Sequence, residues 1–348
     1  MNGDDIAARV FRGSSVEAVH AASVAVVNAR GELTRSFGQP RARFALRSAT
    51  KPFQALSLVT SGAADAFGLD ERDLAIACAS HNGSDAHVEL VRRLLARAGA
   101  KPEHLRCGTH LPIELRLRHA PATRGEDRDP LRHNCSGKHA GFLLLSRFLG
   151  EPFDAYLDPR GKVQSLVKDA VAAALELSTE ELETAVDGCS APTFATPLVA
   201  LARGVKNLAT ASAKTDALDS ALGRVRGAML AEPVFVSGDG RFDYDLARSF
   251  PNNVVNKGGA EAIVAIGFRD PPLGIVVKVH DGAERALAPI TVAVLRALGL
   301  VDDMTRFPFL ARHERPPLVN HAKLRTGELV AEVALRGEPD ETVETEVH

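Results

Sequence analysis

Residues 47–56 contain a serine three positions before a lysine, Ser48 and Lys51, followed at once by Pro52. A serine hydroxyl becomes a good nucleophile when a base takes its proton, and a neutral lysine amine can be that base. Burial and a second nearby cation both lower the pKa of a lysine. On a helix, residues three apart lie about 5–6 Å apart at Cβ, so the amine could reach the hydroxyl. The pair is therefore a candidate catalytic unit, although the same pattern fits an ordinary helix start with a solvated lysine.

Two further motifs resemble parts of known active sites. A Ser-His-Asn motif begins at Ser80 and follows an apolar run, and a Lys-Gly-Gly motif begins at Lys257 and precedes one. Active-serine penicillin-recognising enzymes carry Ser-x-x-Lys, Ser-x-Asn and Lys-Thr-Gly in this order. Lys257 could orient substrate together with Ser80 and hold Lys51 neutral by repulsion. Each motif alone is typical of a turn or loop, but the order of all three favours a site.

The chain has four widely spaced cysteines: Cys78, Cys107, Cys135 and Cys189. This spacing does not resemble a disulfide framework, so we expect free thiols. Cys135 and Cys189 stand at breaks before helices, and thiolates favour zinc, with His133 or His139 as a possible further ligand. The alternative is that these cysteines are small buried fillers, which is our expectation for the other two.

The elements that must position these residues follow from periodicity. Residues 16–36 predict a hairpin around the turn NARG, and Pro52 suits the first turn of a helix that begins at Lys51. Residues 73–80 form a short buried apolar run. We expect helices over 84–99, 138–150, 158–177, 178–186, 196–209, 214–231 and 283–300, with a long functional loop at 116–137. Residues 254–268 and 273–282 predict two adjacent strands, and 318–335 one or two more.

This order of strands, many helices, strands and a helix predicts the fold class. We expect an α/β (α+β) protein, with an antiparallel sheet built from both chain ends and an all-helical lobe, roughly 84–232, inserted between them. A length of 348 residues with 45% hydrophobic content is sufficient for one large composite domain over 1–348.

Composition excludes several classes of function. The net charge of -2 argues against a nucleic-acid binder. No apolar run approaches the roughly 20 residues that span a bilayer, so we expect no membrane partner. The first ten residues, MNGDDIAARV, lack the apolar core of a signal peptide, and we expect a cytoplasmic location.

Four segments together resemble the rhizobial-type L-asparaginases, the asparaginase II family. They are RSATKPFQAL (47–56), CASHNG (78–83), HNCSGKHAGFL (133–143) and DGCSAPTF (187–194), and the similarity extends over roughly residues 15–335. The resemblance implies a fold like that of serine β-lactamases and glutaminases. It also implies hydrolysis of L-asparagine to L-aspartate and ammonia, and a homodimer.

The resemblance assigns roles to particular residues. The catalytic residues would be Ser48, Lys51, Ser80 and Lys257, with Lys278 as the competitor for the last of these. A zinc ion, Zn2+, would be bound by Cys135, Lys138 and Cys189. In the family pattern the third ligand is therefore a lysine, and not His133 or His139. The candidate substrate-binding residues are Arg47, His81, Asn82 and Asp187.

The resulting hypothesis is that Ser48 attacks the side-chain amide of asparagine while Lys51 accepts its proton and later protonates the departing ammonia. Two alternatives stay open. One is a β-lactamase- or glutaminase-like serine amidohydrolase, and the other is a non-catalytic zinc-binding protein that uses the cysteines alone.

Overall fold

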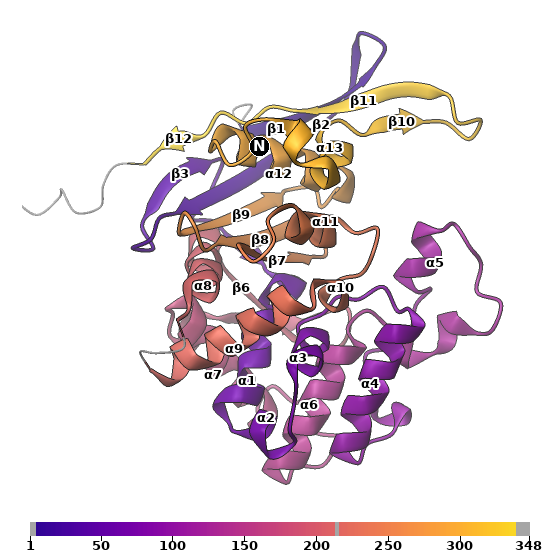
Figure 1. Cartoon of the computed structure of the whole chain (residues 1–348), viewed down its shortest axis with the longest axis vertical. Coiled ribbons are helices and arrows are strands. Elements are labelled where there is room, and N and C mark those ends of the chain that lie inside the picture. Colours follow the sequence, from indigo (N-terminus) through magenta and orange to yellow (C-terminus); the bar gives the residue numbers. More distant parts are fainter. Residues whose placement is uncertain (1–4, 213–215, 339–348) are drawn as a thin grey trace, which may run out of the picture.

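An antiparallel sheet of nine strands forms the upper half of the molecule in Figure 1. The computed structural model describes residues 5–212 and 216–338. Seven strands follow one another in the order β10-β11-β1-β2-β9-β8-β7, while β3 pairs with β2 and β12 pairs with β3. The strands are β1 (Ile6–Arg12), β2 (Ser15–Val27), β3 (Leu33–Phe37), β7 (Val254–Gly259), β8 (Ile263–Phe268), β9 (Leu273–Val279), β10 (Pro317–Val319), β11 (Arg325–Ala331) and β12 (Arg336–Gly337). The sheet therefore joins both ends of the chain, as the sequence predicts.

Below the sheet lies a lobe that is mostly helical (Figure 1). Its helices are α1 (Lys51–Thr60), α2 (Ala63–Ala66), α3 (Glu71–Ala77), α4 (Asp85–Ala98), α5 (Ile113–Leu117), α6 (Ser136–Leu149), α7 (Lys162–Leu175), α8 (Leu198–Thr210), α9 (Ala217–Ala231) and α10 (Pro233–Val236). The lobe thus begins at α1, ahead of the boundary near residue 84 that we expected. Beside it is a small sheet of order β4-β6-β5, formed by β4 (Arg43–Ala45), β5 (Glu183–Val186) and β6 (Pro192–Pro197).

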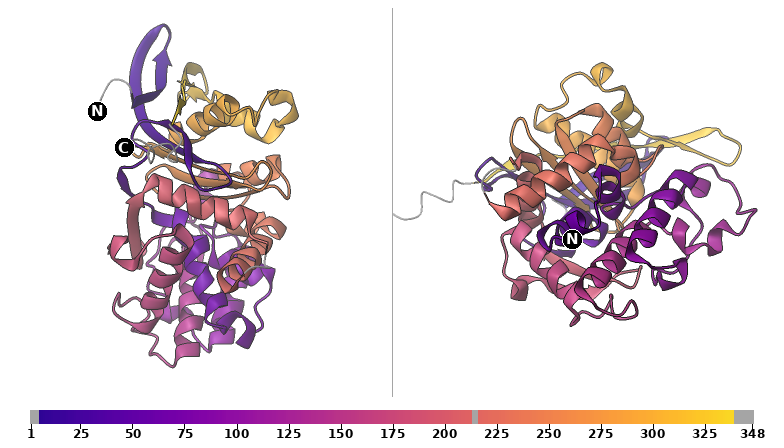
Figure 2. Two further views of the ribbon diagram at one scale, coloured as in Figure 1. Left: turned by 90° about the vertical axis from the view of Figure 1, so that its left-hand side faces the viewer. Right: turned by 60° about the horizontal axis from the view of Figure 1, so that its bottom comes forward.

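The large sheet separates two hydrophobic cores because successive side chains of a strand point to opposite faces. On β2, Val24 and Val26 belong to one core, while Ala25 and Val27 belong to the other. The first core also contains residues of α12 (Glu284–Ala297) and α13 (Pro308–Glu314), and the second contains the helical lobe. Figure 2 shows these layers from the side. The mixed α+β fold class is therefore confirmed.

Helix α8 packs very closely against the lobe side of the sheet. A Cβ atom added to Gly274 on β9 would lie 2.0 Å from the carbonyl oxygen of Ala202, and one added to Gly267 on β8 would lie 2.2 Å from that of Val205. Real Cβ atoms do not approach backbone so closely. Glycine at these two positions is what lets the helix backbone approach the strands.

Several local expectations are confirmed and others are wrong. The N-terminal hairpin is β2 and β3, and residues 318–335 supply β10 and β11. The apolar run at 73–80 contains helix α3, and residues 178–186 form a short 3-10 turn and strand β5 rather than a helix. Residues 254–268 form two strands, β7 and β8, where we expected one, and strand β1 was not predicted. At 178–186 the capping box of Ser178 and Glu181 is present, but it begins only a 3-10 turn, so the cap did not mark a full helix.

None of the helices in the described residues is long and apolar enough to cross a membrane.

Candidate active site

Ser48 lies in a 3-10 turn, η2 (Arg47–Thr50), that runs directly into α1 beneath the edge strand β7. The turn and the strand are pressed together. A Cβ atom on Gly259 of β7 would lie 3.0 Å from the Leu46 carbonyl oxygen and 3.1 Å from the Ala49 nitrogen. The glycine of the Lys-Gly-Gly motif therefore allows the strand to approach the segment that carries Ser48.

Lys51 is buried, with 1% of its surface exposed, and its amine joins three segments of the chain. The Nζ atom lies 2.6 Å from the Ala79 carbonyl oxygen and 2.9 Å from Ser80 Oγ, and 3.2 Å from Cys135 Sγ. Within the described residues, its side-chain hydrogen bonds do not include Ser48. The helical spacing thus brings Lys51 into the same cleft as Ser48, while the direct contact is with the serine of the second motif.

A pocket of about 530 Å³ contains both serines. Ser48 and Ser80 are largely buried, and both line this pocket together with Gly258 and Gly259 of β7. The remaining lining residues are Ile113, Arg116, Leu117, Asn134, Arg241, Phe242, Asp243, Ala260, Glu284, Leu287 and Ala288. The first two motifs and the glycines of the third therefore meet at one cavity between sheet and lobe.

Lys257 is buried beside this pocket, and its amine lies 2.6 Å from the Gly258 carbonyl oxygen and 3.6 Å from Asp243 Oδ2. Burial lowers the pKa of Lys257 to about 8, against the opposing effect of Asp243 and with help from the Lys51 and Arg241 charges. Neither Lys257 nor its competitor Lys278 lines the pocket itself, but Gly258 and Asp243, which Lys257 contacts, do, whereas Lys278 donates to the carbonyl oxygens of Glu261 and Val279. The geometry favours Lys257 as the second lysine of the site.

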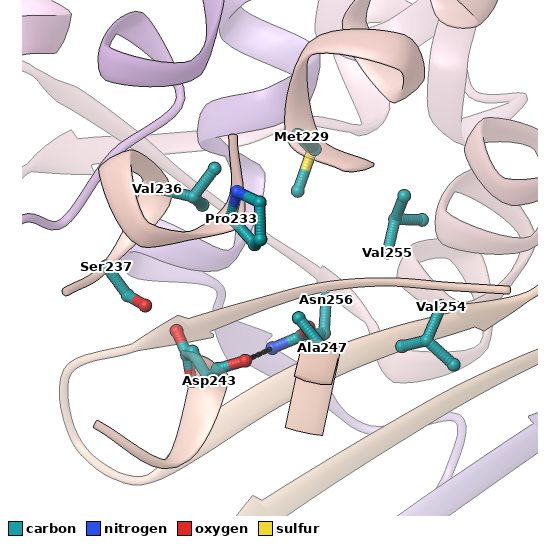
Figure 3. A pocket seen from close by; sticks show the side chains of 9 residues that line it. All are labelled: Met229, Pro233, Val236, Ser237, Asp243, Ala247, Val254, Val255 and Asn256. Carbon is teal, nitrogen blue, oxygen red and sulfur yellow. Dashed lines mark hydrogen bonds between the residues drawn. The ribbon is translucent and has the colours of Figure 1, made fainter. Parts of the chain in front are cut away.

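Asp243 is a pocket residue that the sequence reasoning missed. Its Oδ2 accepts the Gly258 N–H at 2.9 Å, and its carbonyl oxygen accepts from Asn256 Nδ2 at 3.0 Å, the bond that is dashed in Figure 3. Behind it lies a second cavity of only about 10 Å³, the size of one water molecule. Asp243 comes from helix α11 (Phe242–Ser249), 14 positions before Lys257, so no local motif marks it.

Arg47 and Asp187, both predicted to bind substrate, form an ion pair with 2.5 Å between Arg47 Nε and Asp187 Oδ1. Burial opposes ionisation of Asp187, but the charge of Lys138 and the Arg47 hydrogen bond lower its pKa to about 2. Neither residue is among those that line the pocket. Their contact joins η2 to the loop of Cys189, and their role toward substrate stays a prediction.

His81 and Asn82 hold the loop that follows Ser80. His81 is fully buried, its Nε2 lies 2.9 Å from Ser136 Oγ, and its Nδ1 accepts the Gly83 N–H. Burial holds the pKa of His81 well below its usual range, so the ring is neutral. Asn82 donates to the Asp239 carbonyl oxygen at 2.8 Å. These bonds orient the loop, and direct substrate contact by either residue stays a prediction.

The three residues predicted to bind zinc are all buried near the pocket. Lys138 Nζ lies 3.1 Å from Cys189 Sγ, and Cys135 contacts Lys51. The Cys189 hydrogen bond, followed by the charges of Lys51 and Lys138, overcomes burial and holds the pKa of Cys135 well below its usual range. Thiolate character is what a zinc ligand requires. Cys135 therefore suits zinc, whereas the hydrogen bond to Cys135 raises the pKa of Cys189 and, against the effect of burial, the charges of Cys189 and Cys135 raise the pKa of Lys138. Two sulfurs and an amine are a donor set that zinc accepts, provided that binding displaces these protons.

A metal at this place would depend on Lys138. Among residues 5–212 and 216–338, no group of three or more His, Cys, Asp or Glu side chains is arranged to hold a metal ion. The two thiols would need the amine as third donor. The other two cysteines, Cys78 and Cys107, are also buried, and burial raises the pKa of each to about 12, in keeping with inert fillers.

The fold and site together define an α+β protein in which two serines line one pocket and two buried lysines lie next to it, a set of groups suited to amide hydrolysis. The model of the family described as L-asparaginase II matches residues 8–331, and the chain belongs to this family. The family places it among the asparaginase-type amidohydrolases. A search of curated proteins gave no match.

Solved structures that resemble this fold include β-lactamases and a penicillin-binding protein homologue. A candidate β-lactamase from Bacteroides dorei DSM 17855 has 11% identity and a TM-score of 0.40, covering 85% of this chain and 96% of its own. A β-lactamase from Mycobacterium bovis has 16% identity and a TM-score of 0.34, covering 79% and 94%. The octameric penicillin-binding protein homologue from Pyrococcus abyssi has 12% identity and a TM-score of 0.40, covering 84% and 76%. Because these similarities are low, the family match and the site geometry carry the functional conclusion.

Proposed function

We propose that this protein is an L-asparaginase that hydrolyses L-asparagine to L-aspartate and ammonia through a serine nucleophile and a lysine base. The observation that carries the proposal is the buried Lys51 amine, 2.9 Å from Ser80 Oγ, at the pocket that also contains Ser48. An amine at hydrogen-bond distance from a serine hydroxyl, beside the pocket, is placed to exchange a proton with a serine during the reaction. Membership of the L-asparaginase II family supports the amide substrate.

In the proposed reaction, Ser48 Oγ attacks the carboxamide carbon of asparagine, and its proton passes to neutral Lys51. The Ser48 hydroxyl has no hydrogen bond to another group of the described chain, so its oxygen is available to the pocket. Ser80, which contacts Lys51 directly, relays the proton. The backbone N–H of Ser48 supports the negative charge on the former carbonyl oxygen. When the C–N bond breaks, the protonated lysine donates to the leaving nitrogen and ammonia departs.

The second half of the reaction releases L-aspartate. Water attacks the β-aspartyl ester on Ser48 while Lys51, neutral again, takes a proton from the water. The Ser48 oxygen leaves and recovers a proton from the lysine. Lys257 and Asp243 hold strand β7 against the cleft through the Gly258 backbone, which keeps the pocket in shape during both steps.

We further propose that Cys135, Lys138 and Cys189 hold a zinc ion. Bound zinc would supply a positive charge near the pocket, and through its ligands it would link α6 to the loop of Cys189. The chain's own residues already join these parts, because Lys138 contacts Cys189 and Lys51 contacts Cys135. The attacking water is assigned to Lys51 rather than to the metal.

The test compares Ser48→Ala and Ser80→Ala with wild type, using ammonia release from L-asparagine. Ser48→Ala should lower turnover by at least about 10³-fold while zinc content stays unchanged. A diazoketone analogue of asparagine should label Ser48, which mass spectrometry of the digested protein would locate. Near-wild-type turnover of Ser48→Ala would show that Ser48 is not the nucleophile, and a label on Ser80 together with inactivity of Ser80→Ala would assign that role to Ser80.

The same assay separates the alternative functions. Wild type is offered asparagine, glutamine and a chromogenic β-lactam in parallel. Preferential ammonia release from asparagine supports the proposal, whereas faster turnover of glutamine or of the β-lactam favours a glutaminase or a penicillin-recognising hydrolase. Absence of turnover on all three, with bound zinc, favours a non-catalytic zinc protein. The homodimer that the family resemblance implies can be checked by light scattering.

A further inference from the structure

Two arginines, Arg116 and Arg241, line the pocket together with two carboxylates, Asp243 and Glu284. Arg241 lines the cavity, and its Nη1 donates to the Ser80 carbonyl oxygen at 3.3 Å. In the part of the chain that the structure describes, Arg241 makes no ion pair with a carboxylate. By contrast Arg47, the arginine that sequence reasoning offered for substrate, is engaged with Asp187 at 2.5 Å. A half-buried cation at the edge of a cavity, without an acidic partner, attracts an anionic group of the ligand.

Ser80 relates this cation to the proposed reaction. Its hydroxyl lies 2.9 Å from the Lys51 amine, and its carbonyl oxygen lies 3.3 Å from Arg241. The two functional groups of the site are therefore separated by the width of a single residue. In asparagine, the carboxamide carbon and the α-carboxylate carbon are separated by only two carbon atoms, Cα and Cβ. A ligand of this length can present its carboxamide to the serines and its carboxylate to the guanidinium.

Arg116 is the other arginine of the pocket, and it is the natural comparison. It lies on the short helix α5 and its side chain is exposed, whereas Arg241 is partly buried at the start of α11. Water screens an exposed charge more strongly. Arg241 also helps to lower the pKa of the buried Lys257, which places its charge within reach of the catalytic groups. The position of Arg241 is therefore the better one for a fixed contact with substrate.

We propose that Arg241 binds the α-carboxylate of the substrate, an inference that rests on the proposed asparaginase activity. This contact would make the Arg241 guanidinium the group that selects substrates with a free α-carboxylate. The preferred substrate is then a free amino acid with a side-chain carboxamide, or a peptide that ends in one. An asparagine inside a peptide chain has no α-carboxylate, so Arg241 would be left unpaired and turnover would be poor.

Two analogues of asparagine distinguish a direct contact between Arg241 and the α-carboxylate from a general loss of activity. Succinamic acid keeps the carboxylate and lacks the ammonium group, and 3-aminopropanamide keeps the ammonium group and lacks the carboxylate. Arg241→Gln should raise KM for asparagine and for succinamic acid about 100-fold, with a smaller change in kcat. The same variant should change kcat/KM for 3-aminopropanamide less than about threefold. Arg241→Lys keeps the charge and should restore part of the affinity for the two carboxylates.

Arg116→Gln is the matched control, because it removes a second cation from the same pocket, and thermal unfolding of each variant checks the fold. An analogue that is not turned over is measured as a competitive inhibitor of asparagine hydrolysis. The proposal is overturned if Arg241→Gln weakens all three compounds equally or leaves KM unchanged, or if Arg116→Gln shows the carboxylate-selective loss. Failure of the underlying function looks different, since wild type would then release no ammonia from asparagine.

Discussion

Lys51 is a buried amine whose hydrogen-bond partners come from distant parts of the chain. The Ala79 carbonyl and the Ser80 hydroxyl follow α3, and the Cys135 thiol precedes α6. The Cys135 thiol has a lowered pKa because of its hydrogen bond to Cys189 and the charges of Lys51 and Lys138, so the amine lies beside a thiolate. The contact with the Ser80 hydroxyl is the one through which the amine can exchange a proton with a serine.

Replacing Lys51 distinguishes a base from a structural cation. Lys51→Arg keeps a positive charge but cannot lose its proton, so it cannot accept one from a serine. We expect turnover of asparagine to fall by roughly 100- to 10,000-fold in both Lys51→Arg and Lys51→Met, measured as ammonia release. If Lys51→Arg keeps a large share of wild-type activity, the lysine acts only through its charge.

The two candidate metal-binding thiols contact the buried amines of Lys51 and Lys138, and this arrangement allows a matched test. We expect Cys189→Ser to lose bound zinc, since a hydroxyl is a poor zinc ligand, and to raise KM for asparagine by at least about tenfold. Cys107→Ser should retain zinc, because that thiol donates to the carbonyl oxygens of Gly108 and Pro130 and is not one of the proposed ligands. Elemental analysis and steady-state kinetics measure both effects. Equal zinc content in the two variants would contradict the site.

At the scale of elements, the position of the cleft depends on how α8 meets the sheet. This helix packs on β8 and β9, next to β7, which carries Lys257 and the glycines at the pocket. The contact is close because Gly267 and Gly274 have no side chains between strand and helix. A larger residue would separate α8 from the strands and shift the sheet relative to the lobe.

A pair of glycine substitutions tests this packing. In Gly274→Ala the new Cβ would meet the Ala202 carbonyl oxygen at 2.0 Å, so we expect a loss of about 2–3 kcal/mol in the free energy of unfolding. Gly227 lies inside α9 with no atom within 4 Å of an added Cβ, so Gly227→Ala should stabilise the protein by about 0.5–1 kcal/mol. Urea unfolding at pH 7 measures both. The packing interpretation fails if Gly274→Ala is as stable as wild type.

On the scale of the whole molecule, the lobe contains buried histidines that are neutral in the folded state. His87 on α4 lies between Ser84 Oγ, 2.6 Å from its Nδ1, and the Val234 carbonyl oxygen, 3.2 Å from its Nε2. Burial lowers the pKa of His87 to about 4, although the bond to Val234 opposes this shift. His81, stacked on it at 5.0 Å, is shifted in the same direction. Folding therefore requires these rings to stay unprotonated.

This predicts a defined dependence of stability on pH. Below about pH 6.5 the unfolded chain binds a proton at His87 that the folded chain does not. The free energy of unfolding therefore decreases as the pH is lowered from 6.5, and it levels off below pH 4. The shift corresponds to about 3 kcal/mol. We expect His87→Gln to lose stability less steeply than wild type between pH 7 and pH 4, by up to this amount. Parallel slopes in urea unfolding would mean that His87 is protonated in the folded state.

Much of the site could be predicted from the sequence because its central groups lie in short local motifs. Ser48 and Lys51 are three residues apart on one helical turn, so their proximity follows from local geometry. The motifs beginning at Ser80 and Lys257 were recognised by residue type and order, and the structure brings both to the same cleft. The sheet from both chain ends likewise followed from the order of the elements.

Only the tertiary structure decided which groups pair across the cleft. It joined Lys51 to Ser80 and Arg47 to Asp187, and placed Asp243 against Gly258. Spacing along the chain restricts only residues within a turn or two of each other. Contacts between residues more than 100 positions apart, such as that of Arg241 with Ser80, depend on how strand β7, helix α11 and the helical lobe pack together.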